Sequence, residues 1–319
     1  MPDSRVEKFI KLIECLRVPP GKDVKLARDY DPAFKAGWAR KADGRELLEL
    51  GVNMLSEYQD RLAADGSRAL LIVLQGIDAA GKDGTIRHVM SGVNPQGVTV
   101  RSFKVPTDEE LRHDFLWRYQ CALPGRGQIG LFNRSHYEDV LVVRVHPDLL
   151  DHRQLRVTGR PGDLWARRYE DINNWERHLS DNGYKLVKLF LNLSKEEQRT
   201  RFLKRIDLEE KNWKFSPADA RERGHWDDYQ DAFSQMLSHT STEWAPWHVI
   251  PADRKWFARI SAAAVIVEAL VELDPQYPTV SDEDRQALRA ARDALVAEAP
   301  PGAPADPFEA AQAGRDAAS

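Results

Sequence analysis

Short apolar runs alternate with longer amphipathic stretches along most of the chain. The apolar runs have the length of strands, and they lie at residues 69–75, 98–103, 128–133, 184–193 and 247–252. The stretches with the length of helices include residues 44–66, 108–120, 163–182 and 218–238. Strands that alternate with helices predict an α/β fold, in which a parallel sheet has helices on both faces. Such sheets bind ligands beyond the carboxyl ends of their strands.

The two ends of the chain differ from this alternating region. Residues 44–66 show helical periodicity and end at Gly66, so we expect residues 1–65 to form a helical N-terminal extension packed on the core. The main domain is then expected at 66–280. Residues 281–319 contain 13 alanines, and we expect this acidic tail to be helical in its first half and disordered beyond it.

Composition limits the class of protein. Of the 319 residues, 42% are apolar and 30% are charged, as in an ordinary globular protein. The two cysteines, Cys15 and Cys121, are far apart and show no metal-ligand spacing, which argues against a disulfide scaffold. No signal peptide is evident, and the longest apolar stretch, ISAAAVIVEALV, is too short to span a bilayer and contains Glu268. A cytoplasmic protein with no membrane partner is expected.

The charge is unevenly placed. The net charge is −4, and the eight acids and four bases of residues 281–319 account for all of it. Residues 1–280 are therefore formally neutral, and they contain no motif typical of RNA or DNA binding. We expect no nucleic-acid partner, and any basic site in this region must be a local cluster.

A glycine-rich segment, GIDAAGKDGT at residues 76–85, directly follows the first apolar run. Gly76, Gly81 and Lys82 have the spacing of a phosphate-binding loop, in which main-chain N–H groups and the start of a helix face the phosphate. The alternative is an ordinary strand-to-helix turn with a surface lysine. The preceding strand favours phosphate binding, with these candidate substrate-binding residues: Gly76, Ala79, Ala80, Gly81, Asp83, Gly84 and Thr85.

Two acids in this segment need a separate explanation, because they would repel a polyphosphate. Asp78 lies inside the loop, where its carboxylate can hold Mg²⁺ against phosphate oxygens, directly or through water. That role replaces the Ser or Thr hydroxyl that usually follows the lysine, and Thr85 is a weaker candidate for it. Asp83 lies in the first turn of the expected helix, where an acid complements the helix dipole.

Three basic residues outside the loop are further candidates. Arg134 follows the third apolar run, where a fixed guanidinium can clamp a phosphate bidentately. Its alternative role is that of a surface arginine at the end of the strand. Lys104 follows the second run at the same expected edge of the sheet. Arg168, in an arginine-rich stretch, is a candidate for a groove that holds a polyanion.

A basic helix is expected after the fourth apolar run. Ser194 and Glu197 predict a capping box at its start. The helix then presents bases on one face, and further lysines surround Trp213; these bases are Arg201, Lys204, Arg205, Lys211 and Lys214. A solvated helix whose bases are balanced by nearby glutamates is the alternative.

Four segments in this order resemble the polyphosphate kinase 2 family: GIDAAGKDGTI, FKVPT, LWRYQCALPGRGQIGLFNRSHYEDVLVVRVH and EEKNWKFSPADA. The resemblance covers about residues 30–273. It implies a P-loop kinase-like three-layer sandwich with a helical lid at about residues 200–225. It also implies phosphoryl transfer from inorganic polyphosphate to adenine nucleotides, with guanine nucleotides as an alternative, and it implies Mg²⁺, with Mn²⁺ as the alternative metal. Family members are often dimers or tetramers, so a homo-oligomer is expected.

Carried over residue by residue, the resemblance makes Asp78 the metal ligand and Lys82 the phosphate ligand. The second motif reads FNRSHYED, with Asn133 where much of the family has an aspartate and Glu138 where it has an asparagine. This pattern resembles the class that accepts both nucleoside mono- and diphosphates, and it places Glu138 near the base or ribose. Direct, reversible transfer is expected, with these catalytic residues: Asp78, Lys82, Arg134, Arg201 and Arg205.

Two other functions remain open from the residues themselves. An ATP-dependent nucleoside monophosphate kinase would share the fold and much of the loop chemistry, but it would not explain the lysines around Trp213. A non-enzymatic polyanion-binding protein would need the basic residues but not the loop, so replacing Asp78 would leave its function intact. The sequence does not decide between AMP and ADP, and it does not assign a role to the tail.

Overall fold

The computed structural model describes residues 11–37, 41–153, 161–300 and 306. The chain divides into two compact units, Met1–Gln276 and Tyr277–Ser319. What the sequence predicts for residues 1–10 and for most of the chain beyond 300 lies outside the described residues.

The first unit contains a sheet of five parallel strands. They are β1 (Ala69–Gln75), β2 (Val98–Ser102), β3 (Ile129–Asn133), β4 (Tyr184–Asn192) and β5 (Trp247–Pro251). The strand order is β2-β3-β1-β4-β5, so that β1 lies in the centre and pairs with both β3 and β4. Each strand lies within one of the predicted apolar runs, and the predicted parallel sheet is confirmed.

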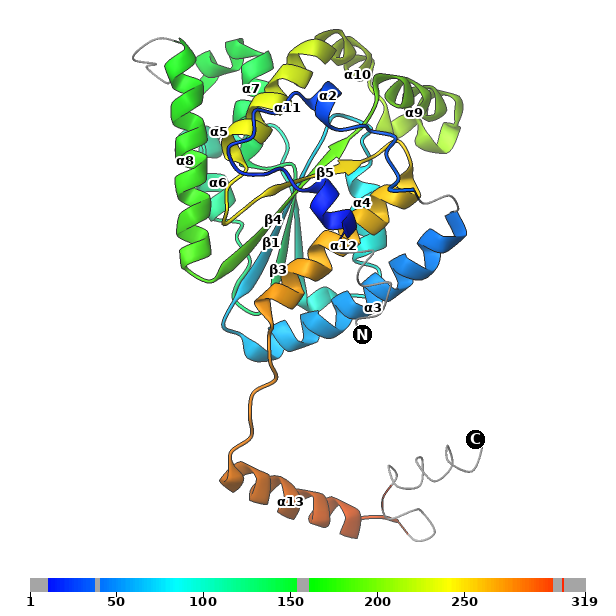
Figure 1. The fold of residues 1–319 in the computed structure, drawn as a ribbon. Coiled ribbons are helices and arrows are strands. Elements are labelled where there is room, and N and C mark those ends of the chain that lie inside the picture. The colour runs from blue at the N-terminus through cyan, green and yellow to red at the C-terminus, as the bar shows by residue number, and fades with distance from the viewer. Residues whose placement is uncertain (1–10, 38–40, 154–160, 301–305, 307–319) are drawn as a thin grey trace. The chain divides into compact units, whose positions relative to one another are not determined.

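Helices cover both faces of the sheet (Figure 1). One face packs against α3 (Lys41–Asp65), α4 (Lys82–Val89) and α12 (Lys255–Leu273), and the other against α8 (Pro161–Asp181) and α11 (Trp226–Thr240). β1 is buried along its whole length, and its side chains alternate between two apolar clusters. Leu70 and Ile72 belong to the first, whereas Leu71 and Val73 belong to the second. The predicted three-layer sandwich is confirmed.

Two predicted helices are interrupted, and there the sequence-based prediction was wrong. The stretch 108–120 forms α5 (Asp108–Leu111) and α6 (Trp117–Gln120), because the Asp114 carboxylate accepts a hydrogen bond from the Leu116 N–H at 2.9 Å and makes a turn. The stretch 218–238 contains α10 (Pro217–Glu222) and the 3₁₀ helix η5 (Arg223–His225) before α11 begins. Gly224 lies in this break.

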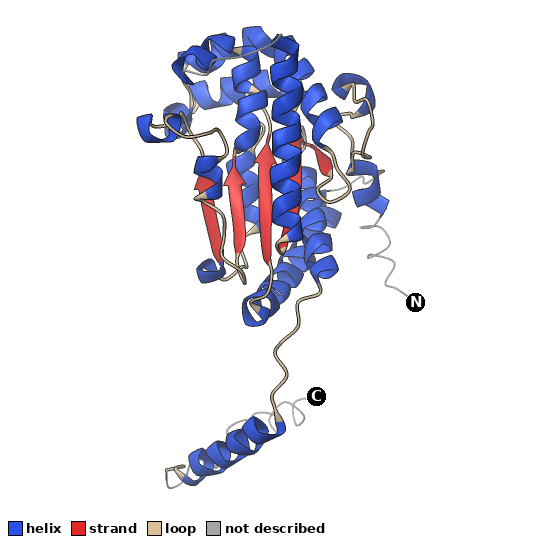
Figure 2. Cartoon of the chain, turned by 90° about the vertical axis from the view of Figure 1, so that its left-hand side faces the viewer, coloured by secondary structure: helices blue, strands red, loops and turns tan. Residues whose placement is uncertain are grey.

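The strands run side by side and point the same way in Figure 2. Further elements of this unit join these strands and helices. They are α2 (Leu26–Asp29), η1 (Pro95–Gly97), η2 (His136–Val140), α7 (Val142–Val145), η3 (Pro147–Arg153), α9 (Lys195–Asp207) and η4 (Glu209–Lys214). Residues 11–16 are helical and bury Leu12 and Leu16 in the core cluster that contains α12. None of the described helices combines the length and the apolar character that a bilayer span requires.

The second unit contains one described helix, α13 (Asp282–Ala297). Ser281 caps it, because its hydroxyl oxygen accepts a hydrogen bond from the Asp284 N–H at 3.0 Å. The helix lies in the first half of the alanine-rich tail, where the sequence predicts one.

Candidate active site

The glycine loop connects the carboxyl end of β1 to the first turn of α4. Gly76 and Gly81 have φ angles of 151° and 107°, and Ala79 has a φ of 64°, so the loop needs left-handed backbone at three positions. A Cβ on Gly76 would lie 2.9 Å from the Leu191 carbonyl oxygen of β4. Only glycine fits there, and the loop therefore turns tightly against the neighbouring strand.

Lys82 begins α4 and folds back over this loop. Its Nζ donates hydrogen bonds to the carbonyl oxygens of Gly76, at 2.6 Å, and Ile77, at 3.4 Å. Burial, together with the charge of Arg134, lowers the pKa of Lys82 to about 8, although nearby carboxylates oppose the shift. The structure therefore places a buried ammonium group over the glycine loop.

Arg134 extends from the end of β3 toward the same loop. Its backbone is left-handed, with a φ of 64°, and its N–H donates to the Leu74 carbonyl oxygen at 3.1 Å. Its guanidinium donates to the Asp78 carboxylate at 2.5 Å and to the Glu138 carboxylate at 3.2 Å. The charge of Glu138 is the main cause that raises the pKa of Arg134. Asp78, Arg134 and Glu138 thus form one charged cluster.

The second loop acid, Asp83, has a neutral partner. The Asn133 side-chain amide donates to the Asp83 carboxylate at 2.7 Å and contacts the Ser102 hydroxyl at 3.4 Å. Because Asn133 stands at the end of β3, this bond ties β3 to the first turn of α4. Gly84 and Thr85 complete that turn, and the Thr85 N–H donates to the Gly81 carbonyl oxygen.

Arg201 of α9 binds the outside of the loop. It is 7% exposed, and its guanidinium donates to the carbonyl oxygens of Ala79 and Ala80, both at 2.9 Å. The predicted capping box of α9 is only half formed. Ser194 accepts from the Glu197 N–H, but the Glu197 carboxylate pairs with Arg201 instead of closing the box.

The other bases of the predicted lid lie farther along. Lys204 and Lys214 are exposed. Arg205 donates to the Lys214 carbonyl oxygen at 3.2 Å, and Lys211 lies 3.5 Å from a Glu210 carboxylate oxygen. Acids on the same elements pair with some of these bases, as Glu197 does with Arg201 and Glu210 with Lys211.

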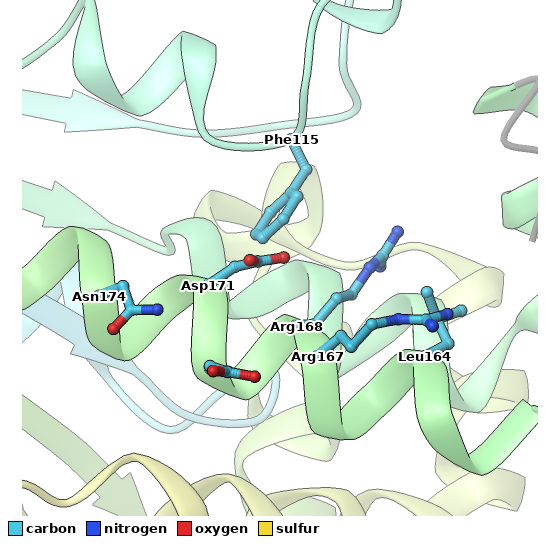
Figure 3. A pocket seen from close by; sticks show the side chains of 7 residues that line it. Phe115, Leu164, Arg167, Arg168, Asp171 and Asn174 are labelled. Atoms are coloured by element: carbon cyan, nitrogen blue, oxygen red, sulfur yellow. The ribbon is translucent and has the colours of Figure 1, made fainter.

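Lys104 and Arg168, two further predicted site residues, make contacts outside the glycine loop. Lys104 is exposed, and its carbonyl oxygen accepts from Arg118. Arg168 is 3% exposed and donates to the Asp139 carbonyl oxygen at 2.6 Å. It borders an open pocket of about 400 Å³, in which Arg167 and Arg168 extend from α8 beside Asp171 (Figure 3). Arg168 therefore supports η2, the element that also contains Glu138.

A small cavity adjoins the charged cluster, and two titratable residues that line it, Glu222 and Tyr229, were not identified from the sequence. Glu222 of α10 and Tyr229 of α11 share a hydrogen bond of 2.5 Å. No sequence motif marks Glu222 or Tyr229, because only the fold brings their segment next to the glycine loop. The residues that line the cavity are Gln75, Gly76, Ile77, Asp78, Arg134, Glu138, Leu141, Val142, Glu222, Tyr229 and Phe233.

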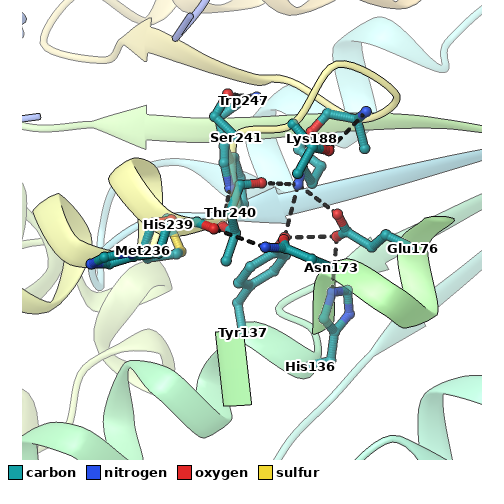
Figure 4. A network of polar contacts seen from close by, with 12 residues as sticks. His136, Tyr137, Asn173, Glu176, Lys188, Met236, His239, Thr240, Ser241 and Trp247 are labelled. Carbon is teal, nitrogen blue, oxygen red and sulfur yellow. Dashed lines mark hydrogen bonds and ion pairs between the residues drawn. The ribbon is translucent and has the colours of Figure 1, made fainter. Parts of the chain in front are cut away.

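A buried polar network joins η2 to α8 and β4 (Figure 4). The Glu176 carboxylate of α8 accepts hydrogen bonds from Tyr137 at 2.7 Å, from Lys188 at 2.6 Å and from His136 at 3.2 Å. Lys188 also donates to the Thr240 carbonyl oxygen at 2.6 Å. The sequence analysis did not predict this network; the signal that could have indicated it is Lys188, a lysine in the middle of an apolar strand.

The residues of the loop fit a divalent metal held partly by phosphate. No group of three or more histidine, cysteine, aspartate or glutamate side chains in the described ranges is arranged to hold a metal ion by itself. Mg²⁺ commonly binds through one or two carboxylates together with substrate phosphates. Asp78 offers one such carboxylate inside the glycine loop, and its partner Arg134 is itself suited to bind phosphate.

Comparison with known proteins identifies relatives over most of the chain. The family model described as Polyphosphate kinase 2 matches residues 38–278. A protein of Rhodopseudomonas palustris named ADP-polyphosphate phosphotransferase is 49% identical over 284 residues, which cover 88% of this chain and 97% of the relative. A protein of Meiothermus ruber named AMP/ADP-polyphosphate phosphotransferase is 45% identical, over 82% of this chain and 94% of the relative.

A solved structure agrees with these sequence relatives. The crystal structure of polyphosphate kinase 2 from Arthrobacter aurescens has a TM-score of 0.79 and 41% sequence identity. The match covers 88% of this chain and 96% of that chain. The region that the family model matches, residues 38–278, contains the whole sheet and the glycine loop.

Proposed function

This chain belongs to the polyphosphate kinase 2 family, and from that membership we propose that it is a Mg²⁺-dependent kinase that phosphorylates both AMP and ADP. Its reaction class is that of its relatives, namely phosphoryl transfer from polyphosphate to a nucleotide. The names of the relatives favour polyphosphate as the donor over the ATP-dependent alternative. Beyond this reaction class, we propose that both AMP and ADP are acceptors.

The arrangement of charged side chains at the glycine loop gives this proposal its most direct support. Lys82, Asp78 and Arg134 meet at the carboxyl end of the central strands, although Arg134 is 52 residues from Lys82 in the sequence. Cations on two sides of a glycine loop provide the charge that a polyphosphate end needs. Preorganised charge is the main contribution of a protein to phosphoryl transfer.

The proposed reaction is a direct displacement at phosphorus. A terminal phosphate oxygen of the nucleotide attacks the last phosphorus of polyphosphate. The bond to the bridging oxygen then breaks, and the chain leaves one phosphate shorter. The acceptor oxygen is already ionised, so no general base is needed, and transfer is reversible because both sides contain phosphoanhydrides. Lys82 and Arg134 stabilise the charge on the transferring group, whereas Arg201 holds the loop that presents it.

The metal is proposed to bind through Asp78. When bound, Mg²⁺ would neutralise charge on the donor and acceptor phosphates. In the protein alone, the Asp78 carboxylate is held by Arg134 at 2.5 Å. The same guanidinium can turn to a phosphate oxygen once the carboxylate has another cation.

The acceptor preference is tested with purified protein, Mg²⁺ and long-chain polyphosphate in the absence of ATP. With AMP as the only acceptor, ADP is expected first and ATP afterwards; with ADP as the only acceptor, ATP is expected. The M. ruber relative, named for both nucleotides, supports this outcome. ATP from ADP without any product from AMP would contradict the dual-acceptor proposal and would agree with the name of the R. palustris relative.

The pH dependence of activity should report on Lys82. Its pKa of about 8 means that the free protein loses the ammonium charge as the pH rises through 8. We therefore expect kcat/KM for polyphosphate to fall above about pH 8, whereas kcat falls at higher pH because a bound polyanion raises the pKa. The measurement is a pH–rate profile from pH 7 to pH 10. Arginine keeps its charge over this range. If kcat/KM of a Lys82→Arg variant fell at the same pH, the fall would belong to another titrating group.

A homo-oligomer in the cytoplasm stays a prediction from the sequence. Light scattering of the purified protein tests its oligomeric part.

A further inference from the structure

The proposed lid segment, residues 200–225, leaves the body through α9 and returns through η5. Arg223, in η5, joins these two ends. Its guanidinium donates to the Lys195 carbonyl oxygen at 2.9 Å and to the side-chain oxygen of Gln198 at 2.7 Å. We call Glu222 and Arg223, where the segment returns, the hinge. The hinge is therefore bonded to α9, the helix through which the segment leaves.

Gln198 extends this connection to the glycine loop. Its amide nitrogen donates to the Asp78 carbonyl oxygen at 2.9 Å, while its amide oxygen accepts from Arg223. Gln198 is only 2% exposed, so water does not replace either bond easily. A planar amide that bonds at both ends fixes the distance between the hinge and the main chain of Asp78.

The residue before Arg223 fastens the same hinge to the body. The Glu222 carboxylate accepts hydrogen bonds from Tyr229 at 2.5 Å and from His146 at 2.7 Å. Glu222 and Tyr229 also line the cavity that contains Asp78 and Arg134. Adjacent hinge residues thus reach the loop and the charged cluster from two directions.

We propose that Gln198 is a positioning residue, which couples the hinge of the lid segment through Arg223 to the main chain of the glycine loop at Asp78. The coupling holds the loop in place when the lid segment lies over it. This role rests on the proposed function, because a lid over a phosphoryl-transfer site must exclude water as a competing acceptor. Gln198 touches neither substrate in this account and acts through Asp78.

Limited proteolysis tests the coupling itself, without any assumption about the reaction. Trypsin can cleave the lid segment after its exposed residues Lys204, Lys214 and Arg221. We expect Gln198→Leu to speed these cleavages about five- to tenfold, the factor that corresponds to one hydrogen bond. The matched control is Gln235→Leu, the same change at a half-buried position on α11. The Gln235 side-chain oxygen contacts the ring of His239 on the same helix. Cleavage that is no faster than in the control, or that is faster along the whole chain, would overturn the coupling.

The second measurement is the ratio of polyphosphate hydrolysis to transfer onto ADP. This ratio does not depend on the fraction of folded enzyme, so a merely structural role would leave it unchanged. We expect the ratio to rise about five- to tenfold in Gln198→Leu and in Arg223→Met, and no further in the double variant, because both changes break one path. An unchanged ratio in Gln198→Leu would show that the residue only stabilises the fold. If the unmodified protein transfers nothing from polyphosphate, the proposed function fails, and proteolysis still decides the coupling.

Discussion

Replacing Lys82 with methionine is expected to lower kcat/KM for transfer from polyphosphate by about 10³-fold, which is the scale of losing one preorganised charge contact with the transferring group. Lys82 is buried over the loop, and its Nζ lies 2.6 Å from the Gly76 carbonyl oxygen. Methionine has a similar length and tolerates burial, so the loop should keep its conformation. The measurement is steady-state kinetics with ADP as the acceptor, together with a thermal unfolding curve of the variant.

Lys185→Met is the matched control for this experiment. Lys185 lies near the amino end of β4, far along the strand from the loop, and pairs with Glu272 at 2.5 Å. We expect the control to keep its activity within about twofold, since surface ion pairs contribute little. More than a tenth of the original activity in Lys82→Met, with the fold intact, would remove Lys82 from the proposed mechanism.

The largest effect on stability is expected from the buried network. Lys188→Met should lower the free energy of unfolding by about 3–5 kcal/mol, because it leaves the Glu176 carboxylate buried without its cation. Lys188 and Glu176 are both fully buried, with 2.6 Å between the ammonium and the carboxylate. Burial by itself would raise the pKa of Glu176, but the charge of Lys188 and the bond from His136 outweigh it and lower that pKa. Denaturant unfolding curves, followed by tryptophan fluorescence, measure the loss.

A double variant separates the lost partner from lost packing. Lys188→Met combined with Glu176→Leu removes both charges, and we expect it to recover part of the stability lost in Lys188→Met. Recovery should be incomplete, since Tyr137 and His136 then lack their shared acceptor. A loss below about 1 kcal/mol in Lys188→Met would mean that Glu176 finds another cation or water, and that the network is not a closed unit.

The sequence predicts the sheet well because parallel strands that are buried on both faces read as continuous apolar runs. The glycine loop is equally legible, since its turn needs Gly76 and Gly81 at fixed positions. The position of Arg134 beside this loop could be predicted because it follows a strand end, and all these strands end at one edge of the sheet. In each case a local pattern sufficed.

Contacts between distant segments were not legible in the same way. Periodicity places Arg201 on one helical face with Lys204, yet Arg201 is 7% exposed and Lys204 is exposed. Residues three positions apart differ by about 60° around a helix. This difference is enough for Arg201 to face the glycine loop while Lys204 faces solvent. Gln198 and Glu222 have no motif at all, because their roles depend on how α9 and α10 lie against a loop more than 100 residues earlier.

Phosphate is proposed to move from polyphosphate at the glycine loop to a nucleotide. The most direct test is to incubate the purified protein with ³²P-labelled polyphosphate, unlabelled ADP and Mg²⁺, with no ATP, beside the Lys82→Met variant. Label is expected in the terminal phosphate of ATP with the unmodified protein, and about 10³-fold less label with the variant. Absence of labelled ATP, from a protein that still phosphorylates AMP when ATP is supplied, would contradict the proposal.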